Sequence, residues 1–281
     1  MGAKTIKTDK KKSKTSKAIE IWNALNKPLY WFYENRLLNE VVNAETLPNH
    51  IGIIMDGNRR FAKSIGLDVK VGHDYGAKKA RAVLDWCVEL GIKHVTIWGF
   101  SSENKGRAED EVEHLHSIFT QQAKMLIDDQ KLHENKIRVR IIGDIDSFPE
   151  ETKDALAKME EATKNYSGMS LNVALGYGGR EEIVAAVQSL LVDKAESGMS
   201  ASEIAELISP EEIEQHLYTA GIPDPDFVIR TSGEIRLSGF LLWQTAYSEF
   251  YFVDANWPDF RKLDFLRAIR NYQARERRFG K

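Results

Sequence analysis

Short apolar runs alternate with helix-like segments along most of the chain. Apolar, β-rich runs occur at residues 50–55, 93–100, 137–142, 170–175, 226–230 and 249–253. Apolar residues recur every three or four positions at about 74–90, 109–132, 150–163, 180–195, 210–219 and 261–276. This alternation predicts an α/β fold with an open, mostly parallel twisted sheet of about six strands flanked by helices. Six strands are too few for an eight-stranded barrel, which favours the open sheet.

An amphipathic pattern also precedes the first strand. Across residues 18–42, apolar side chains recur at helical spacing, and Pro28 is expected to kink the helix. The apolar positions are Ile19, Trp22, Leu25, Leu29, Phe32, Leu37 and Val41. We therefore predict a basic, disordered tail at 1–17, an amphipathic helical extension at 18–45 and a single domain at 46–281.

The net charge of −3 is unevenly distributed. Residues 1–17 contain seven Lys and one Asp, a local charge of +6, so the remaining 264 residues carry −9. Such a tail is typical of a solvated arm, or of a segment that contacts an anionic membrane surface at about 1 kcal/mol for each Lys. The acidic body argues against nucleic-acid binding. The lone Cys87 excludes an internal disulfide, and no apolar run is long enough to span a membrane, so we expect a cytoplasmic protein.

The first candidate site follows the first apolar run. It reads Asp56-Gly57-Asn58-Arg59-Arg60 and precedes a helical pattern. Gly57 permits a tight turn, Asp56 is the kind of oxygen ligand that Mg²⁺ uses beside phosphate oxygens, and both arginines can donate to an anion. Because ligands of open α/β sheets bind beyond the carboxyl ends of the strands, this segment indicates a diphosphate and magnesium site. The alternative is a capped helix start with surface arginines.

A second charged cluster follows the run at 226–230. Arg230, Arg236 and Ser238 lie directly behind a buried strand, where their desolvation is costly unless an anion meets them. Competing chemistry is missing from the sequence: it has no G-x-x-x-x-G-K-[ST] loop, no zincin histidine spacing and no G-x-S-x-G elbow. The sequence therefore favours two separate anion sites over nucleotide, metalloprotease or serine hydrolase sites.

Three motifs follow one another in order along the chain. They read HIGIIMDGNRRFA from His50, FSSEN from Phe100 with Arg107 after it, and RTSGEIRLSGFLLWQ from Arg230, followed by Tyr247-Ser-Glu249 and Trp257-Pro-Asp-Phe260. Together they resemble the motifs of the cis-prenyltransferases, the undecaprenyl diphosphate synthase family, over His50 to Gly280. The resemblance implies condensation of an allylic prenyl diphosphate with isopentenyl diphosphate into a polyprenyl diphosphate with cis double bonds. It also implies a homodimer, or a heteromer as in some lineages.

The resemblance assigns roles to individual residues. It implies that Asp56 and Glu249 are associated with Mg²⁺, that Asp56 and Asn58 act in catalysis, and that Glu234 supports the arginine cluster. Ser101, Asn104 or the departing diphosphate is left to assist proton loss. The implied substrate-binding residues are Gly57, Asn58, Arg59, Arg60, Phe61, His73, Arg107, Arg230, Arg236, Ser238, Arg278 and Gly280. Small side chains at Ala77, Ala80 and Gly99 match positions that line the tunnel for the growing chain.

Four places depart from the family pattern. Val69, with Lys70 beside it, stands where many members carry Arg, and Phe61 replaces Trp. Residues 105–108 replace a Trp and Arg-Pro stretch, and Ile235 stands where some members have His. These changes leave open a relative that prenylates another acceptor, such as a phosphorylated lipid. An inert, lipid-binding partner subunit is disfavoured because Asp56 and the C-terminal Arg-x-Gly motif at 278–280 are present.

Overall fold

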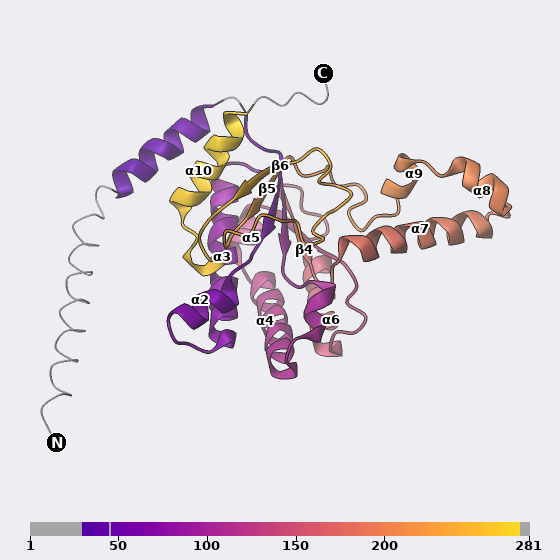
Figure 1. The fold of residues 1–281 in the computed structure, drawn as a ribbon, viewed down its shortest axis with the longest axis horizontal. Helices are drawn as coiled ribbons and strands as arrows, with labels where there is room; N and C mark the ends of the chain where they lie inside the picture. The colour runs from indigo at the N-terminus through magenta and orange to yellow at the C-terminus, as the bar shows by residue number, and fades with distance from the viewer. Residues whose placement is uncertain (1–29, 45, 276–281) are drawn as a thin grey trace, which may run out of the picture.

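A computed structural model describes residues 30–44 and 46–275, and it contains a six-stranded sheet in which every strand pairing is parallel (Figure 1). The strands are β1 (His50–Ile54), β2 (His94–Trp98), β3 (Ile137–Ile142), β4 (Met169–Ala174), β5 (Phe227–Arg230) and β6 (Glu249–Phe252). They lie in the order β3-β4-β2-β1-β5-β6. The predicted α/β fold and all six predicted strands are confirmed.

The helices connect these strands. They are α2 (Asn58–Ser64), α3 (Val69–Glu89), α4 (Glu109–Ile127), α5 (Gln130–Glu134), α6 (Glu150–Thr163), α7 (Gly179–Glu196), α8 (Ala201–Leu207), α9 (Pro210–Glu214) and α10 (Lys262–Gln273). The helix predicted over 109–132 is wrong as one element, because Asp129 starts a new helix by accepting a hydrogen bond from the backbone of Leu132 at 3.1 Å. The pattern at 210–219 yields only the short α9, and α8 was not predicted.

The two faces of the sheet are covered differently. In β1, Ile51 and Ile53 point into the large apolar cluster formed with α3, α4, α6 and α10. Ile54 belongs to the smaller cluster on the other face, with Phe240 from the segment after β5. Alternate residues of a strand point to opposite faces, so a central parallel strand must be apolar throughout. This explains why β1 reads as a continuous apolar run and is fully buried.

The extension before β1 packs against the last helix. Residues 30–43 form a helix, and its Leu37 and Val41 are buried in the large cluster. Gln273 of α10 donates a hydrogen bond to the backbone oxygen of Val41 at 2.9 Å. The predicted apolar face therefore covers α10. The predicted tail at 1–17, the rest of the amphipathic helix and its kink at Pro28 lie outside the described residues.

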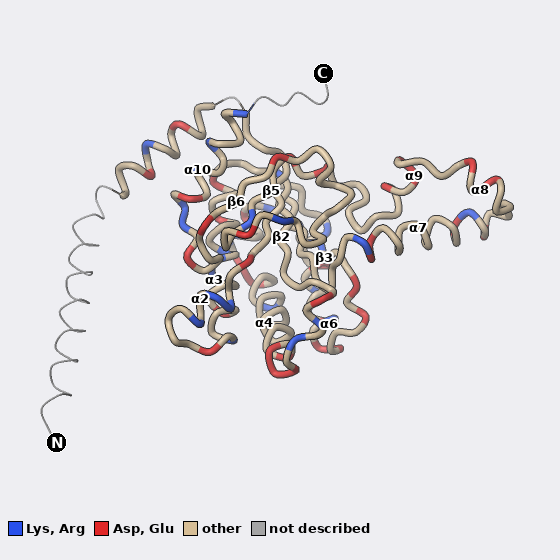
Figure 2. The backbone as a smooth tube through the Cα atoms, in the orientation of Figure 1, with Lys and Arg blue, Asp and Glu red and all other residues tan. Residues whose placement is uncertain are grey.

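A long arm leaves the body on the side opposite this extension. Figure 1 shows α7 projecting outward, with α8 and α9 folded back along it. Acidic and basic residues are interspersed along the described backbone, including the arm (Figure 2). Over the described ranges, no helix combines the length and apolar character needed to cross a bilayer.

Candidate active site

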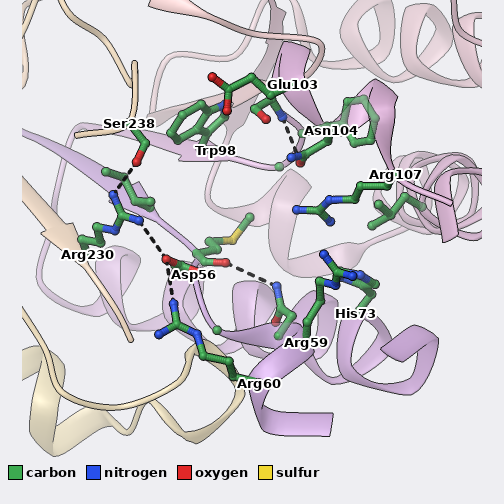
Figure 3. A pocket seen from close by; sticks show the side chains of 18 of the residues that line it. Asp56, Arg59, Arg60, His73, Trp98, Glu103, Asn104, Arg107, Arg230 and Ser238 are labelled. Carbon is green, nitrogen blue, oxygen red and sulfur yellow. Dashed lines mark hydrogen bonds and ion pairs between the residues drawn. The ribbon is translucent and has the colours of Figure 1, made fainter. Parts of the chain in front are cut away.

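The sheet order brings three loops from distant parts of the chain to one edge. β2, β1 and β5 are parallel neighbours, so the segments that follow them emerge together at the carboxyl edge. A cavity of about 490 Å³ opens there (Figure 3). It is lined by Ile54, Met55, Asp56, Gly57, Asn58, Arg59, Arg60, Lys63, His73, Trp98, Gly99, Phe100, Ser101, Glu103, Asn104, Arg107, Leu115, Arg230 and Ser238. Most of the residues predicted from the sequence thus share one cavity.

Asp56 lies between Arg60, which follows it by four residues, and Arg230, which comes from a distant part of the chain. Its Oδ2 accepts hydrogen bonds from Nη2 of Arg230 at 2.8 Å and from Nη2 of Arg60 at 3.2 Å. Arg230 ends β5 and is only 4% exposed. Nη1 of Arg230 also donates to Oγ of Ser238 at 3.0 Å and to the backbone oxygen of Arg236. The two predicted anion sites therefore meet at one carboxylate.

The surroundings of Asp56 favour its ionised form. Burial acts to raise the pKa of this carboxyl group, but the hydrogen bonds from Arg230 and Ser232 and the charges of Arg230 and Arg60 outweigh burial. The pKa of Asp56 consequently lies below its usual value, and the group is a carboxylate at neutral pH. The cavity lining as a whole is net positive, as an anionic ligand requires, because Asp56 and Glu103 are outnumbered by the basic side chains Arg59, Arg60, Lys63, Arg107 and Arg230.

The loop after β5 is held in an uncommon backbone conformation. Ser232 and Ser238 both have positive φ, at 80° and 53°. Such residues cost about 1–3 kcal/mol each and persist where the surroundings hold them. Arg60 stabilises this conformation, because its Nη2 donates to Oγ of Ser232 at 2.8 Å and its Nη1 donates to Oε1 of Glu234 at 3.0 Å. This loop therefore presents Ser238 to the cavity in a fixed shape.

Two glycines determine where Asn58 lies. Gly57 has φ of 108°, and a Cβ there would lie 2.8 Å from Cα of Asn256. A Cβ at Gly76 of α3 would lie 2.4 Å from Oδ1 of Asn58. The absence of both side chains lets the chain turn sharply out of β1 and lets α2 lie directly against α3. Asn58 then donates through Nδ2 to the backbone oxygen of Met55 at 3.3 Å.

A buried carboxylate that sequence reasoning missed stands behind one wall of the cavity. Oε1 of Glu111, in the first turn of α4, lies 3.0 Å from Nε2 of His73, 3.1 Å from Nη1 of Arg107 and 3.6 Å from Nε of Arg59. Burial lowers the pKa of His73 more than Glu111 raises it. One local signal in the sequence pointed to Glu111: it follows Arg107 by four residues, the spacing at which opposite charges meet along a helix.

Ser101 and Asn104 lie together on the third loop. Ser101 pairs with Tyr177 in a parallel bridge just beyond β2. The backbone N–H of Ser101 donates to Oδ1 of Asn104 at 3.2 Å, which closes the 3₁₀ turn over Ser102–Gly106. Both residues line the cavity, as predicted, so both lie within reach of a molecule bound there.

Some predicted residues do not line the cavity. The ring of Phe61 packs against Tyr75, with centroids 5.4 Å apart. The side chain of Arg236 is 57% exposed and pairs with Glu234 beside the mouth. Among the predicted tunnel positions, Gly99 lines the cavity, whereas Ala77 and Ala80 do not. Arg278 and Gly280 lie outside the described residues.

The two predicted metal ligands are not brought together within the chain. Glu249 begins β6 and pairs with Arg275. β6 aligns Phe252 with Arg230, so Glu249 lies three residues, or roughly 10 Å, back along the strand from the level of Arg230. Asp56 follows the carboxyl edge, whereas Glu249 lies at the amino edge. Parallel pairing thus places Asp56 and Glu249 at opposite edges of the sheet. The order of the motifs along the chain did not reveal this separation.

Asp56 fits a magnesium ion that takes its other ligands from a substrate. No group of three or more His, Cys, Asp or Glu side chains in the described part of the chain could hold a metal. Mg²⁺ in phosphate-handling sites is commonly held by one or two carboxylates, with phosphate oxygens and water completing its shell. An ionised Asp56 in a cavity rich in arginine meets that requirement once a diphosphate is present.

Comparison with known proteins assigns the family. The family model described as "Putative undecaprenyl diphosphate synthase" matches residues 54–280, a range that includes the Asp56 and Arg230 loops. The chain belongs to the cis-prenyltransferase family. It is 56% identical over 258 residues to an isoprenyl transferase of Thermus thermophilus, with 92% of this chain and 98% of the relative covered.

Other relatives of this cis-prenyltransferase extend the likeness. It is 47% identical over 255 residues to a tritrans,polycis-undecaprenyl-diphosphate synthase (geranylgeranyl-diphosphate specific) of Methanopyrus kandleri, with 91% and 92% of the two chains covered. The structure of lavandulyl diphosphate synthase from Lavandula x intermedia in complex with dimethylallyl diphosphate matches with a TM-score of 0.76 and 36% identity, covering 86% of this chain and all of that one. The protein is a transferase with the family's fold.

Proposed function

We propose that this cis-prenyltransferase condenses isopentenyl diphosphate with an allylic prenyl diphosphate, in the presence of Mg²⁺, to make a polyprenyl diphosphate. The observation that carries the proposal is Asp56 held between Arg60 and Arg230 in one cavity. Names of similar proteins support the substrate class: one relative is called geranylgeranyl-diphosphate specific, and one similar structure holds dimethylallyl diphosphate.

Two sets of hydrogen-bond donors support a reaction between two polyanions. Arg59, Arg60 and His73 line the side of the cavity built by α2 and α3, and Arg230 with Ser238 lines the side built by the loop after β5. Free diphosphates repel each other, so separate sets of donors are needed to hold both at reacting distance. We assign the first set to the allylic diphosphate and the second to isopentenyl diphosphate.

The chemistry follows from charge. The bond between the allylic carbon and the diphosphate oxygen breaks, and its electron pair leaves with the diphosphate. Asp56 would hold Mg²⁺, which would supply positive charge for that leaving group. Arg59, Arg60 and Arg107 add fixed guanidinium donors, which stabilise the developing charge without reorganisation. The alkene of isopentenyl diphosphate then attacks the allylic carbon, and the proton that is lost passes to the departing diphosphate, directly or relayed through Ser101 and Asn104 in the cavity lining.

The apolar part of the lining suits the prenyl group. Ile54, Met55, Trp98, Phe100 and Leu115 contribute hydrophobic surface to the same cavity as the charged groups. Ligand sites commonly combine an apolar lining with a few placed polar groups in this size range. We propose that the prenyl chain lies along these side chains, with its diphosphate at Asp56.

Incubation with labelled isopentenyl diphosphate tests the function. The primers are dimethylallyl and geranylgeranyl diphosphate, each with Mg²⁺ and with a chelator. We expect label to enter a longer, organic-soluble product only when primer and Mg²⁺ are both present. No incorporation with either primer would contradict the proposal, and transfer to a phosphorylated lipid instead would identify the other acceptor that the departures at Val69 and residues 105–108 left open.

We also propose that the chain is a cytoplasmic homodimer that contacts an anionic membrane surface. Trp31 and Phe32 are 68% and 63% exposed at the start of the helix at 30–43, and the seven Lys of residues 1–17 precede them. Aromatic side chains beside a basic segment are typical of interfacial binding. The homodimer part of the proposal rests on α7, where the apolar side chains of Val184 and Val192 are exposed away from the body.

Vesicle co-sedimentation and analytical ultracentrifugation test these two contacts. We expect binding to phosphatidylglycerol vesicles and not to phosphatidylcholine vesicles, and we expect deletion of residues 1–17 to abolish it. Unaffected binding after that deletion would remove the tail from the proposal.

Ultracentrifugation of the full chain is expected to show a dimer, and a monomer at micromolar concentration would contradict the proposed homodimer.

A further inference from the structure

Glu111 occupies an unusual position for a residue in the first turn of a helix. Its neighbours Glu109 and Asp110 are exposed, whereas Glu111 is 6% exposed. It does not line the cavity, but three basic residues that do line it converge on its Oε1. A buried carboxylate is retained at little cost only where such partners satisfy it.

The three basic residues come from three different parts of the chain. Arg59 belongs to α2, His73 to α3, and Arg107 to the segment between the 3₁₀ turn and α4. A single carboxylate oxygen therefore connects three separate elements of the chain. Each guanidinium has five N–H donors, so Arg59 and Arg107 can contact Glu111 and still donate to a ligand.

We propose that Glu111 is a positioning residue that holds Arg59, His73 and Arg107 as one preformed wall for the diphosphate of the allylic substrate. The identity of that ligand rests on the proposed function. Without the carboxylate, two long arginine side chains would sample many rotamers, and they would have to be ordered at the moment of binding. With it, the donors are ordered in advance.

Glu111 also determines the state of His73. Its carboxylate accepts from Nε2, so the ring proton is held on that nitrogen. The charged or titratable groups that face His73 are Glu111, which raises the pKa of the imidazole, and Arg107 and His114, which lower it, as burial does. Removing the carboxylate leaves burial and positive charge unopposed, so His73 would titrate at lower pH.

The alternative is that Glu111 merely complements the positive end of α4. Glu109 already does so from the same turn without touching a residue of the cavity lining, and Asp110 pairs instead with Lys70 at 3.0 Å on the surface. Glu109→Gln is therefore a matched control: it removes the same charge from the same helix turn and leaves the wall intact.

The kinetic test compares Glu111→Gln, Glu111→Asp and Glu109→Gln. We expect Glu111→Gln to raise KM for the allylic diphosphate about tenfold, with KM for isopentenyl diphosphate changed less than twofold. Glu111→Asp keeps the charge and is expected to restore part of the loss, while Glu109→Gln behaves as wild type. Equal increases in both KM values, or an equal effect of Glu109→Gln, would overturn the proposal.

A second measurement does not depend on turnover. The imidazole signal of His73 is followed by NMR while inorganic diphosphate is added to the full chain, with circular dichroism confirming that each variant is folded. We expect Glu111→Gln to weaken the apparent affinity about tenfold and to lower the titration midpoint of His73. Wild-type affinity and midpoint in the folded variant would overturn the positioning role, even if the enzyme made polyprenyl diphosphate. The expected weakening would support the role even if prenyl transfer were not observed.

Discussion

Nη2 of Arg230 lies 2.8 Å from Oδ2 of Asp56, although 174 positions separate the two residues in the sequence. β1 and β5 are adjacent and parallel, so the residues at their carboxyl ends meet. Arg230 is almost fully buried, and the pair joins the loop after β1 to the loop after β5. Asp56 and Arg230 therefore hold each other in place, and a change at either of these two residues is expected to disturb the other.

Replacing Asp56 by Asn tests the centre of this arrangement. The substitution keeps the size of the side chain but removes its charge, so it weakens metal binding, leaves Arg230 without its counter-ion and leaves Arg60 paired only with Glu234. We expect kcat for isopentenyl incorporation to fall by a factor of about 10² or more. Asp85→Asn, which breaks only a surface pair with Lys131, serves as control. Undiminished turnover in Asp56→Asn would contradict the role proposed for this carboxylate.

Gly76→Ala tests whether close contact between α2 and α3 matters for binding. Alanine alone would favour the helix by about 1 kcal/mol. Its Cβ, however, would lie 2.4 Å from Oδ1 of Asn58, so the Asn58 side chain must move. We expect a more than tenfold loss in kcat/KM without a gain in Tm. Gly106→Ala, where the new Cβ meets no atom within 4 Å, should remain active. An active and more stable Gly76→Ala would show that the site tolerates a displaced Asn58 side chain.

Gly99→Leu tests the course of the prenyl chain. Gly99 lines the cavity, and a Cβ there would lie 2.9 Å from Cδ2 of Leu175, so a leucine must displace side chains at this part of the cavity wall. We expect shorter polyprenyl products by chromatography, and a smaller change from Ala77→Leu, since Ala77 does not line the cavity. If Gly99→Leu made products of unchanged length, the chain would have to run elsewhere.

His50 predicts a pH dependence of stability. Burial lowers the pKa of this imidazole to about 4. The neutral ring donates from Nδ1 to the backbone oxygen of Pro223 and accepts through Nε2 from Thr96. The unfolded chain, with a histidine pKa of about 6.5, binds more protons than the folded chain between these values, so stability present above pH 6.5 is lost as the pH falls toward 4.

Urea unfolding at several pH values measures this effect. For His50 alone, we expect about 2 kcal/mol less free energy of unfolding at pH 5 than at pH 7.5. The His50→Gln variant removes the titrating group, so its stability should depend less on pH over this range by that amount. Parallel curves for the two proteins would mean that His50 does not remain neutral in the fold.

Local pattern was sufficient for most elements and for the residue types of the site. A buried parallel strand must be apolar throughout, so runs such as 137–142 stood out and coincide with β3. Pattern failed where a cap outweighed periodicity, as at Asp129, and where the helix is too short to establish a period, as in the seven residues of α8. Glu111 escaped notice because an acidic residue in the first turn of a helix is ordinary, and only its burial and its three partners distinguish it.

The amino-acid sequence by itself determined the succession of strands and helices and the chemical groups that follow each strand, because both depend on neighbours along the chain. The strand order was decided only by the tertiary structure, because many orders would bury these apolar runs equally well. That order places Asp56 beside Arg230 and gathers Arg59, His73 and Arg107 around Glu111. It also leaves Glu249 at the opposite edge, since parallel pairing puts the start of β6 away from the end of β1.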